Sequence, residues 1–365
     1  MKKALIIAAA ALAAICCTRP VSDLQRGEPS PALAEGFAEF LDSVRASMTP
    51  PIDWMKAVNL HSIMVVKDGK IVEEQYFGSW TADTPHAMFS VSKTFTAAAV
   101  GLAIREGKMS LDDKVADYFP DRQVEGNPCN ATVEDLLKMA GGHDTDPTFK
   151  ALEVDRIKGE SHIKEGEEVA NDFFSHPFVH EPGELFVYNS LGTYVLSAII
   201  TKVTGESVLD YLTPRLFEPL GIEKPAWEAD KYGINAGGWG LSLKTGDMAR
   251  MGQLLLQKGR WGRKQLIPSD WVEAMSSKHI DCAPAGVRIE DAERICGIPN
   301  EINDWCQGYC YQMWRGTHGS YRADGAGGQY ILVLPEKNAV IIMTSWTGNL
   351  QNQMNLVWKL IYPNL

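Results

Sequence analysis

The sequence has little positive charge and almost no long apolar stretches. Among its 365 residues, 35 Lys and Arg stand against 46 Asp and Glu, so the formal net charge is −11. It contains no basic run beyond its N-terminus, which argues against nucleic acid or an anionic membrane surface as a partner. Internal repeats and low-complexity tracts are also missing, so neither a repeat architecture nor a disordered chain is expected.

Cysteine is scarce as well, and paired Cys-x-x-Cys spacing is absent. We therefore predict no zinc site. The four cysteines between positions 282 and 310 allow three disulfide pairings, which the sequence does not rank, and free thiols are the open alternative. The cysteines that follow position 17 are Cys129, Cys282, Cys296, Cys306 and Cys310.

Residues 1–17 have the pattern of a secretory signal. Two lysines precede an apolar stretch over residues 4–15 that is too short to span a bilayer as a lasting helix. Cys16 and Cys17 at its end resemble the acylated position of a lipoprotein signal, so we expect export to the periplasm or cell envelope and a lipid anchor. Ordinary cleavage a few residues earlier is the alternative. Residues 18–31 would then form a polar leader.

Residues 32–365 have the composition of one globular domain, because the chain is 45% hydrophobic and 22% charged. Apolar spacing predicts a first helix over residues 33–44. Two strands are expected next, at 62–66 and 70–77. The Asp-Gly pair between them is typical of a tight hairpin.

The middle of the domain, about residues 111–230, is largely helical and is expected to form an all-α subdomain. Strand composition returns near the C-terminus, so both chain ends would build one antiparallel sheet flanked by helices, an α/β fold of the α+β type. The charged stretch 154–169 is expected to be an exposed loop. The other predicted elements are helices at 132–139, 247–257 and 350–361 and strands at 309–314, 328–334 and 339–345.

Ser90 and Lys93 form the most informative pair of residues. They stand three apart at the start of a small-residue, apolar helix predicted over residues 95–104. At that spacing both side chains share one helical face, so the lysine amine can take the serine proton. A free hydroxyl is a weak nucleophile at neutral pH, and an adjacent base is one of the few ways in which a protein can activate it. The pattern therefore predicts a nucleophilic serine.

The same Ser-x-x-Lys spacing recurs at Ser161 and Lys164. This copy lies in a charged stretch with no small-residue helix behind it, so nothing would desolvate the lysine. We interpret it as chance. The hypothesis that Ser90 is a nucleophile therefore depends on the small-residue helix that follows it, more than on the spacing alone.

Tyr188-Asn189-Ser190 lies in a loop directly before a helix predicted over residues 194–203. A phenol beside a lysine ammonium has its ionised form favoured, so Tyr188 is a candidate base for the nucleophile and acid for the leaving group. Ser190 is a candidate hydrogen-bond partner of the lysine. The alternative is a tyrosine packed under a loop, with Ser190 capping the helix.

A glycine-rich stretch over residues 323–329 precedes the last strands. Glycine allows a backbone to come close to a ligand. A strand edge near Gly325 whose amide faces Ser90 would give the second donor of an oxyanion hole, with the N–H of Ser90 as the first. A simple hairpin turn is the alternative.

These three elements, in this order, resemble the motifs of the serine β-lactamase and penicillin-binding protein superfamily, in particular its class C-like branch with esterases and 6-aminohexanoate-dimer hydrolases. Family-like phrases at residues 203–205, 216–221 and 237–241 extend the resemblance, which runs from about residue 62 to 346. It implies a β-lactamase/transpeptidase-like fold.

The resemblance also implies roles for individual residues. Ser90 would be the acylated nucleophile, Lys93 its proton partner and Tyr188 the acid/base. Ala326 would lend the oxyanion amide. We further expect Trp239 to form a wall of the acyl pocket.

Two departures from the family pattern bear on the site. The tyrosine motif commonly ends in Asn, but Ser190 stands there, which leaves open which residue contacts Lys93. The third motif commonly begins with Lys or His, which helps to hold a substrate carboxylate, but Ala323 stands there. The sequence therefore predicts a preference for neutral substrates. Arg315 or Arg322 is the alternative source of a cation.

Other candidate motifs are interpreted as structural. The Lys-Thr-Gly sequence at residues 244–246 leads into a helix, whereas the motif of the family lies on a strand, so Thr245 is expected to cap that helix. Residues 141–146 hold ligand-type side chains in a tight loop after a helix, and we interpret them as a turn.

The sequence thus predicts an exported, monomeric serine hydrolase that cleaves a small-molecule ester, amide or lactam through an acyl-enzyme, without metal or organic cofactor. A β-lactamase or D-Ala-D-Ala carboxypeptidase is the alternative enzyme. A non-catalytic penicillin-binding-like sensor domain, acylated without turnover, is the alternative of another class.

Overall fold

The computed structural model describes residues 20–53, 56–120, 130–148, 152–155, 160–163 and 169–365, the two four-residue segments by their backbone alone. The predicted signal sequence with Cys16 and Cys17 lies outside these ranges. Cys129 and Lys164 also lie outside them.

The main sheet joins both ends of the chain. Within the described residues it has seven strands, and neighbours are antiparallel except for the parallel edge pair β1 and β3. The predicted antiparallel sheet built from both chain ends is confirmed. In spatial order the strands are β1 (Gln25–Arg26), β3 (Lys70–Tyr76), β2 (Leu60–Lys67), β14 (Ala339–Ser345), β13 (Gln329–Leu334), β12 (Tyr321–Gly325) and β11 (Trp314–Arg315).

Most of the predicted strands of the main sheet are present, and the sequence did not predict its short strands β1 and β12. The β2–β3 hairpin turns at Asp68 and Gly69, both with positive φ, as its Asp-Gly pair predicted. β13 and β14 lie where they were expected. Of the strand predicted over residues 309–314, only Trp314 lies in β11. Near Gly325 the sequence predicted a strand edge, with a hairpin turn as the alternative. The structure has both, because β12 ends at Gly325 and a turn over residues 326–328 joins it to β13.

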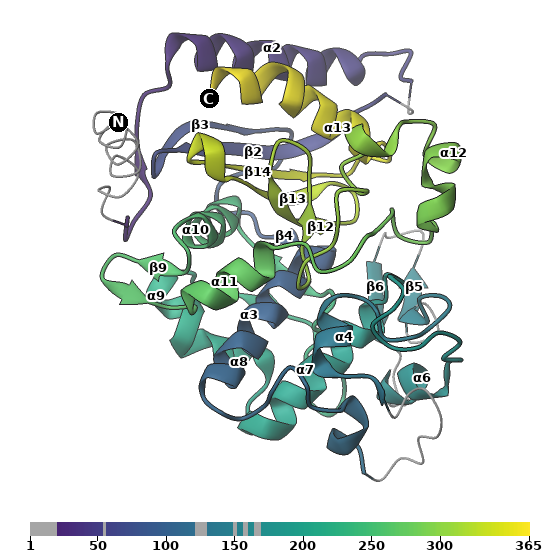
Figure 1. Cartoon of the computed structure of the whole chain (residues 1–365). Helices are drawn as coiled ribbons and strands as arrows, with labels where there is room; N and C mark the ends of the chain where they lie inside the picture. The colour runs from purple at the N-terminus through teal and green to yellow at the C-terminus, as the bar shows by residue number, and fades with distance from the viewer. Residues whose placement is uncertain (1–19, 54–55, 121–129, 149–151, 156–159, 164–168) are drawn as a thin grey trace, which may run out of the picture.

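Helices cover both faces of the sheet (Figure 1). One face lies under α2 (Pro31–Ser47) and α13 (Leu350–Leu356), and the opposite side faces α10 (Thr245–Leu256) and α3 (Ser92–Arg105). The predicted first helix, the helix near residue 247 and the closing helix are therefore confirmed. The closing helix continues as a π-helical turn, Val357–Ile361.

The alternation of side chains along β2 separates two cores. Ile63 and Val65 belong to the core under α2 and α13, whereas Met64 and Val66 belong to the larger core with α3 and α10. Successive side chains of a strand point to opposite faces, so a strand with apolar residues on both faces must be covered on both. This burial places β2 at the centre of the fold.

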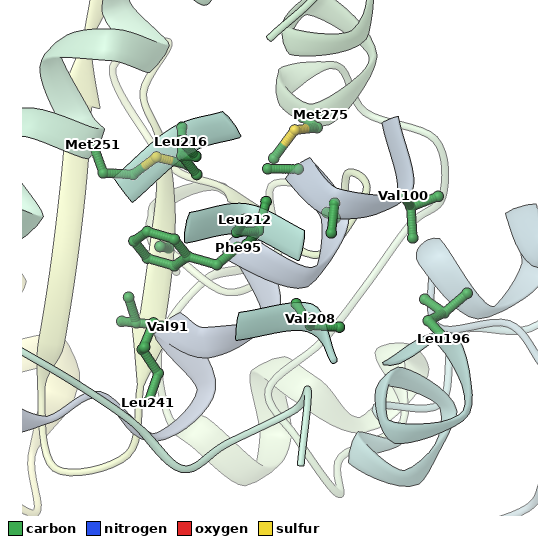
Figure 2. Close-up of a cluster of buried hydrophobic side chains, with 14 of the residues drawn as sticks. Val91, Phe95, Val100, Leu196, Val208, Leu212, Leu216, Leu241, Met251 and Met275 are labelled. Carbon is green, nitrogen blue, oxygen red and sulfur yellow. The ribbon is translucent and has the colours of Figure 1, made fainter. Parts of the chain in front are cut away.

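Helix α3 lies in the middle of the larger core. Every one of its residues from Ser92 to Ala103 is buried. Figure 2 shows Phe95 and Val100 among side chains from the neighbouring helices, and the ring of Phe95 stacks at 5.8 Å on that of Phe217. A helix packed on all sides cannot shift without opening cavities, so the residues at its start are held in a fixed frame.

The region from residue 111 to 230 is mostly helical but is not all-α. The stretch predicted as an exposed loop contains an antiparallel hairpin in its described part, β5 (Leu152–Asp155) with β6 (Glu160–Ile163). Charge alone led to the loop assignment, and charged residues do not prevent strand pairing. The helices are α4 (Val133–Leu137), α6 (Val169–Ser175), α7 (Ser190–Thr204), α8 (Val208–Leu212) and α9 (Glu218–Leu220), with a π-helical turn at Thr213–Phe217.

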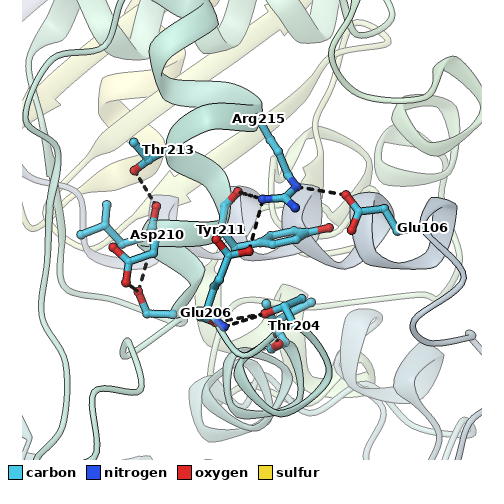
Figure 3. Close-up of polar contacts among 10 residues, drawn as sticks. Glu106, Thr204, Glu206, Asp210, Tyr211, Thr213 and Arg215 are labelled. Carbon is cyan, nitrogen blue, oxygen red and sulfur yellow. Dashed lines mark hydrogen bonds and ion pairs between the residues drawn. The ribbon is translucent and has the colours of Figure 1, made fainter.

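Polar contacts tie this helical region to the end of α3 (Figure 3). Arg215 donates from Nε to Glu106 Oε1 at 3.0 Å and from Nη1 to the Tyr211 carbonyl oxygen at 3.0 Å. Its guanidinium also lies 3.9 Å from the ring centroid of Tyr211. The C-terminal end of α3 is therefore fixed to α8 by a stacked and hydrogen-bonded arginine.

Smaller elements complete the domain. The predicted leader is not a free linker, because β1 pairs with β3 and the Val21 carbonyl oxygen accepts a hydrogen bond from Gly262 N at 2.9 Å. No helix among the described residues is long and apolar enough to cross a membrane. The remaining elements are β4 (His86–Ala87), β7 (Ala226–Trp227), β8 (Leu241–Leu243), β9 (Arg260–Trp261), β10 (Lys264–Gln265), α11 (Ser269–Ser276) and α12 (Ala292–Cys296).

Candidate active site

Ser90 lies in a one-turn 3-10 helix, Phe89–Val91, that leads directly into α3. Phe89 has φ of 45°, in the left-handed region that an aromatic residue rarely adopts. Such strain costs of order 1–3 kcal/mol and persists only where the surrounding fold imposes it. The turn thus presents Ser90 in a conformation that local preference alone would not select.

Lys93 is buried beneath Ser90, with 1% of its surface exposed. Its Nζ donates hydrogen bonds to Ser90 Oγ at 2.8 Å, Ser190 Oγ at 3.0 Å and the Gly238 carbonyl oxygen at 2.8 Å. No carboxylate among the described residues forms an ion pair with it. Desolvation lowers the pKa of Lys93 to about 7, against the opposing charges of Asp146 and Asp324. Near neutral pH the amine is therefore available in its neutral form.

Tyr188 lies next to both groups. Lys93 Nζ is 4.9 Å from its ring centroid, and Trp314 stacks on the ring at 5.6 Å. Burial raises the pKa of Tyr188, although a hydrogen bond with Ser90 acts in the opposite direction. The prediction of a favoured phenolate was therefore wrong, because desolvation of the buried phenol outweighs any help from the neighbouring lysine. At neutral pH Tyr188 therefore keeps its phenolic proton beside Ser90 and Lys93.

The residue that contacts Lys93 from the tyrosine motif is Ser190. Ser190 is the first residue of α7, and its hydroxyl accepts the lysine's hydrogen bond. Asn189 instead caps α7 by accepting from Gly192 N at 3.1 Å, and its amide nitrogen lies 3.1 Å from His143 Nδ1. The alternative left open by the sequence is resolved in favour of serine. Ser190 is not among the residues that line the cavity described below.

The end of β12 approaches the turn that carries Ser90. A Cβ added to Gly325 would lie 2.5 Å from the Met88 carbonyl oxygen, so only glycine allows this approach. Gln329 Nε2 donates to the Ala326 carbonyl oxygen at 3.0 Å and fixes the turn. Ala326 lines the same cavity as Ser90. The turn that contains Ala326 therefore borders the same cavity as Ser90, as the predicted oxyanion role requires.

A cavity of about 800 Å³ opens at Ser90. Trp239, predicted as a wall of the acyl pocket, is not among its lining residues but is packed in the larger core. The nearby Gly237–Gly238 backbone matters instead, because it supplies the carbonyl oxygen that Lys93 binds. The lining combines Ser90, Tyr188, Asp324 and Ala326 with Pro284, Ala285, Cys296, Ile298, Asn303, Trp305, Trp314, Gly348, Asn349, Leu350, Gln351, Asn352 and Asn355.

The residue of β12 that lines this cavity is Asp324. Ala323 belongs to the larger core, since neighbouring residues of β12 point to opposite faces. Arg322 is fully buried and pairs through Nε with Asp324 Oδ2 at 3.0 Å. Arg315 lines a different cavity, beside α11. Neither arginine supplies a cation to the lining of the Ser90 cavity. The period-two alternation of β12, had the strand been recognised, would have singled out Asp324.

The Lys-Thr-Gly sequence, residues 244–246, is not part of the lining of the Ser90 cavity. Lys244 forms an ion pair with Asp83 at 3.1 Å and directly precedes α10, so the helix predicted after this motif is confirmed. Thr245 is the first residue of the helix instead of its cap, and its hydroxyl lies 2.7 Å from Ser62 Oγ. The helix start is satisfied by Asp247, which accepts from Lys244 N at 3.2 Å.

The remaining candidates are structural in the described parts of the chain. His143, in the loop interpreted as a turn, is buried and its Nε2 lies 2.9 Å from the Phe173 carbonyl oxygen. No group of three or more His, Cys, Asp or Glu residues that could hold a metal ion occurs among the described residues. Four cysteines that the sequence left open for pairing are free: Cys282, Cys296, Cys306 and Cys310. Ser161, from the second Ser-x-x-Lys copy, lies on strand β6 and not at a helix start.

Comparison with known proteins shows the family of the chain. The family model described as Beta-lactamase matches residues 57–355, most of the chain. The chain therefore belongs to the Beta-lactamase family, whose members are serine hydrolases of the β-lactamase and transpeptidase fold.

Relatives and solved structures are of the same kind. A 6-aminohexanoate-dimer hydrolase of Paenarthrobacter ureafaciens is 25% identical over 297 residues, which cover 78% of this chain and 72% of that protein. Among solved structures, a putative 6-aminohexanoate-dimer hydrolase from Bacillus anthracis superposes with a TM-score of 0.70 at 22% identity, covering 94% and 87% of the two chains. A penicillin-binding protein homologue from Pyrococcus abyssi gives 0.67 at 21% identity, with 90% and 77% covered.

Proposed function

We propose that this protein is a serine hydrolase that cleaves a small-molecule ester or amide through a serine acyl-enzyme. The observation that carries the proposal is the contact between Ser90 Oγ and the buried, uncompensated amine of Lys93 at 2.8 Å. Membership of a serine hydrolase family supports it. Its class C-like esterase or amidase character rests on the motifs of the sequence.

The proposed reaction uses the groups in turn. Ser90 Oγ attacks the carbonyl carbon and its proton passes to the neutral amine of Lys93. The amides of Ser90 and Ala326 would stabilise the oxyanion. Protonated Lys93 then returns the proton to the leaving group, directly or through the Tyr188 phenol, and the carbon to leaving-group bond breaks. Water repeats the sequence on the acyl-enzyme, releasing the acid and Ser90.

The test is a covalent label combined with turnover. A serine-reactive fluorophosphonate should add to the intact protein once, at Ser90, and Ser90→Ala should remove both the adduct and the hydrolysis of 4-nitrophenyl butyrate. Ser161→Ala is the matched control and should change neither. An adduct on another serine, or an adduct without steady-state turnover, would contradict the proposal, and the second result would favour a sensor domain.

We also propose that the protein is exported and anchored by lipid at Cys16 or Cys17, on the strength of the signal-like residues 1–17. Expression with an alkyne-tagged palmitate should label the full chain. The double variant Cys16→Ser/Cys17→Ser should lose the label. Label that persists in the double variant would contradict the anchor.

A further inference from the structure

The cavity at Ser90 carries one charged side chain that the proposed reaction does not use. Asp324, two residues before Ala326, lines the cavity together with Ser90 and Tyr188. Among the described residues that line it there is no lysine, arginine or histidine. The charge that a bound substrate meets at this wall is therefore that of a carboxylate.

The carboxylate is held in place from behind. Its Oδ2 accepts from Arg322 Nε at 3.0 Å, and the Trp305 side chain is a second hydrogen-bond partner. Arg322 is anchored in turn, because its Nη1 donates to the Asp304 carbonyl oxygen at 2.9 Å and its guanidinium lies 4.5 Å from the ring centroid of Trp305. Asp324 thus has a fixed orientation at the cavity wall.

The carboxylate keeps both charge and acceptor capacity. Burial raises the pKa of Asp324 to about 6, so it is mostly ionised at pH 7. Two carboxylate oxygens offer about four lone-pair sites, of which the donors from Arg322 and Trp305 use two. Its charge reaches the reacting groups, because it raises the pKa of both Lys93 and Tyr188.

We propose that Asp324 selects substrates that carry a cationic group, a primary or quaternary ammonium, near the scissile ester or amide bond. The inference rests on the proposed acyl-enzyme function and deepens it by naming the substrate class. Trp305 and Trp314 line the same cavity, and aromatic rings favour cations as neighbours. An anionic group at this position would contact the carboxylate itself, since the Arg322 guanidinium lies behind Asp324 and not in the lining of the cavity.

Matched substrates test the charge, and the cationic and neutral members of each series have the same shape. On the acyl side they are the 4-nitrophenyl esters of 4-(trimethylammonio)butyrate, of its neutral isostere 5,5-dimethylhexanoate and of glutarate. On the leaving-group side they are acetylthiocholine, S-(3,3-dimethylbutyl) thioacetate and S-acetyl-3-mercaptopropionate. Rates with Ser90→Ala are subtracted as background. In at least one series kcat/KM should be about tenfold higher for the cation than for the neutral ester, and lowest for the anion, as expected for a charge-assisted contact.

Variants then test whether Asp324 is the residue that causes the preference for cationic substrates. Asp324→Asn should reduce the ratio of cationic to neutral kcat/KM to about one, but it leaves Arg322 buried without its partner and endangers the fold. The double variant Arg322→Met/Asp324→Leu removes both charges and should give the same ratio. Asp281→Asn, which removes an exposed carboxylate at a neighbouring cavity, is the control for general charge and should keep the wild-type ratio.

The outcomes separate the two proposals. If the wild-type enzyme hydrolyses neither the six substrates nor any other simple ester, the proposed hydrolase function is contradicted. If it turns over the neutral esters as fast as the cationic ones in both series, or faster, the role of Asp324 is overturned while the hydrolase function stands. An equal drop of the ratio in Asp281→Asn would also overturn it, because the net charge of the protein and not Asp324 would then set the preference. The wild-type series decides even where a variant fails to fold.

Discussion

Two lysines of this protein, Lys93 and Lys244, lie in very different surroundings. Lys93 is 1% exposed, has neutral oxygens as its partners and has a pKa lowered to about 7. Lys244 has 37% of its side chain exposed and pairs with Asp83. Each belongs to a short motif typical of the same enzyme family. Burial without a counter-ion, and not the motif, therefore lowers the pKa of a lysine enough for it to act as a base at neutral pH.

The largest expected effect tests that contrast directly. Lys93→Met, close in length and without the amine, should lower kcat/KM for 4-nitrophenyl butyrate on the order of 10³-fold, because the proton acceptor for Ser90 is lost. Lys244→Met should stay within about threefold of wild type. Circular dichroism melting of both variants checks that each is folded. Similar losses in the two variants would mean that the third motif lies at Lys244 after all.

The next effect concerns the phenol beside Lys93. Tyr188→Phe keeps the stacking on Trp314 but removes the hydroxyl, and should reduce kcat about 10²-fold by removing one proton relay. Tyr309→Phe, a buried neighbour in the same aromatic cluster, is the control and should change kcat by less than about threefold. Full activity of Tyr188→Phe would leave Lys93 as the sole proton carrier.

The pH dependence of kcat/KM should follow the ionisation of Lys93 and not that of Lys244. Since the neutral amine of Lys93 is the active form and its pKa is about 7, kcat/KM should rise roughly tenfold per pH unit below pH 7 and level off above about pH 8. The profile of Lys244→Met should be unchanged. A profile that is flat from pH 5 to 8, with enzyme stable throughout, would show that protonated Lys93 is competent or that another group is the base.

The smallest effect is expected at the exposed lysine. Asp83→Asn removes the partner of Lys244, but an exposed ion pair is screened by solvent and contributes about 0–1 kcal/mol. The free energy of unfolding from urea titration should therefore change by less than about 1 kcal/mol, and less still at high salt. A loss above about 2 kcal/mol would mean that Lys244 has a structural role that its exposure hides.

Sequence patterns predicted where helices and strands lie more reliably than which side chains of a strand line the cavity. The hairpin at Asp68 and Gly69 and the helix that follows Ser90 were predictable, because turn chemistry and apolar runs are local. Strand β12 was missed since only five residues separate its start from a glycine turn, and with it the prediction chose Ala323 where Asp324 lines the cavity. A shift of one position along a strand exchanges its two faces.

The sequence by itself determined the proximity of Ser90 and Lys93, the proposed nucleophile and its base, since they are one helical turn apart in any helix that contains them. It also determined the order of the motifs and the sheet built from both chain ends. Only the tertiary structure decided that Lys93 is desolvated, that Ser190 is its partner from the tyrosine motif, and that Tyr188 holds its proton. These properties depend on what residues far apart in the chain place around a side chain, and electrostatics in a protein depends on those surroundings more than on the residue type.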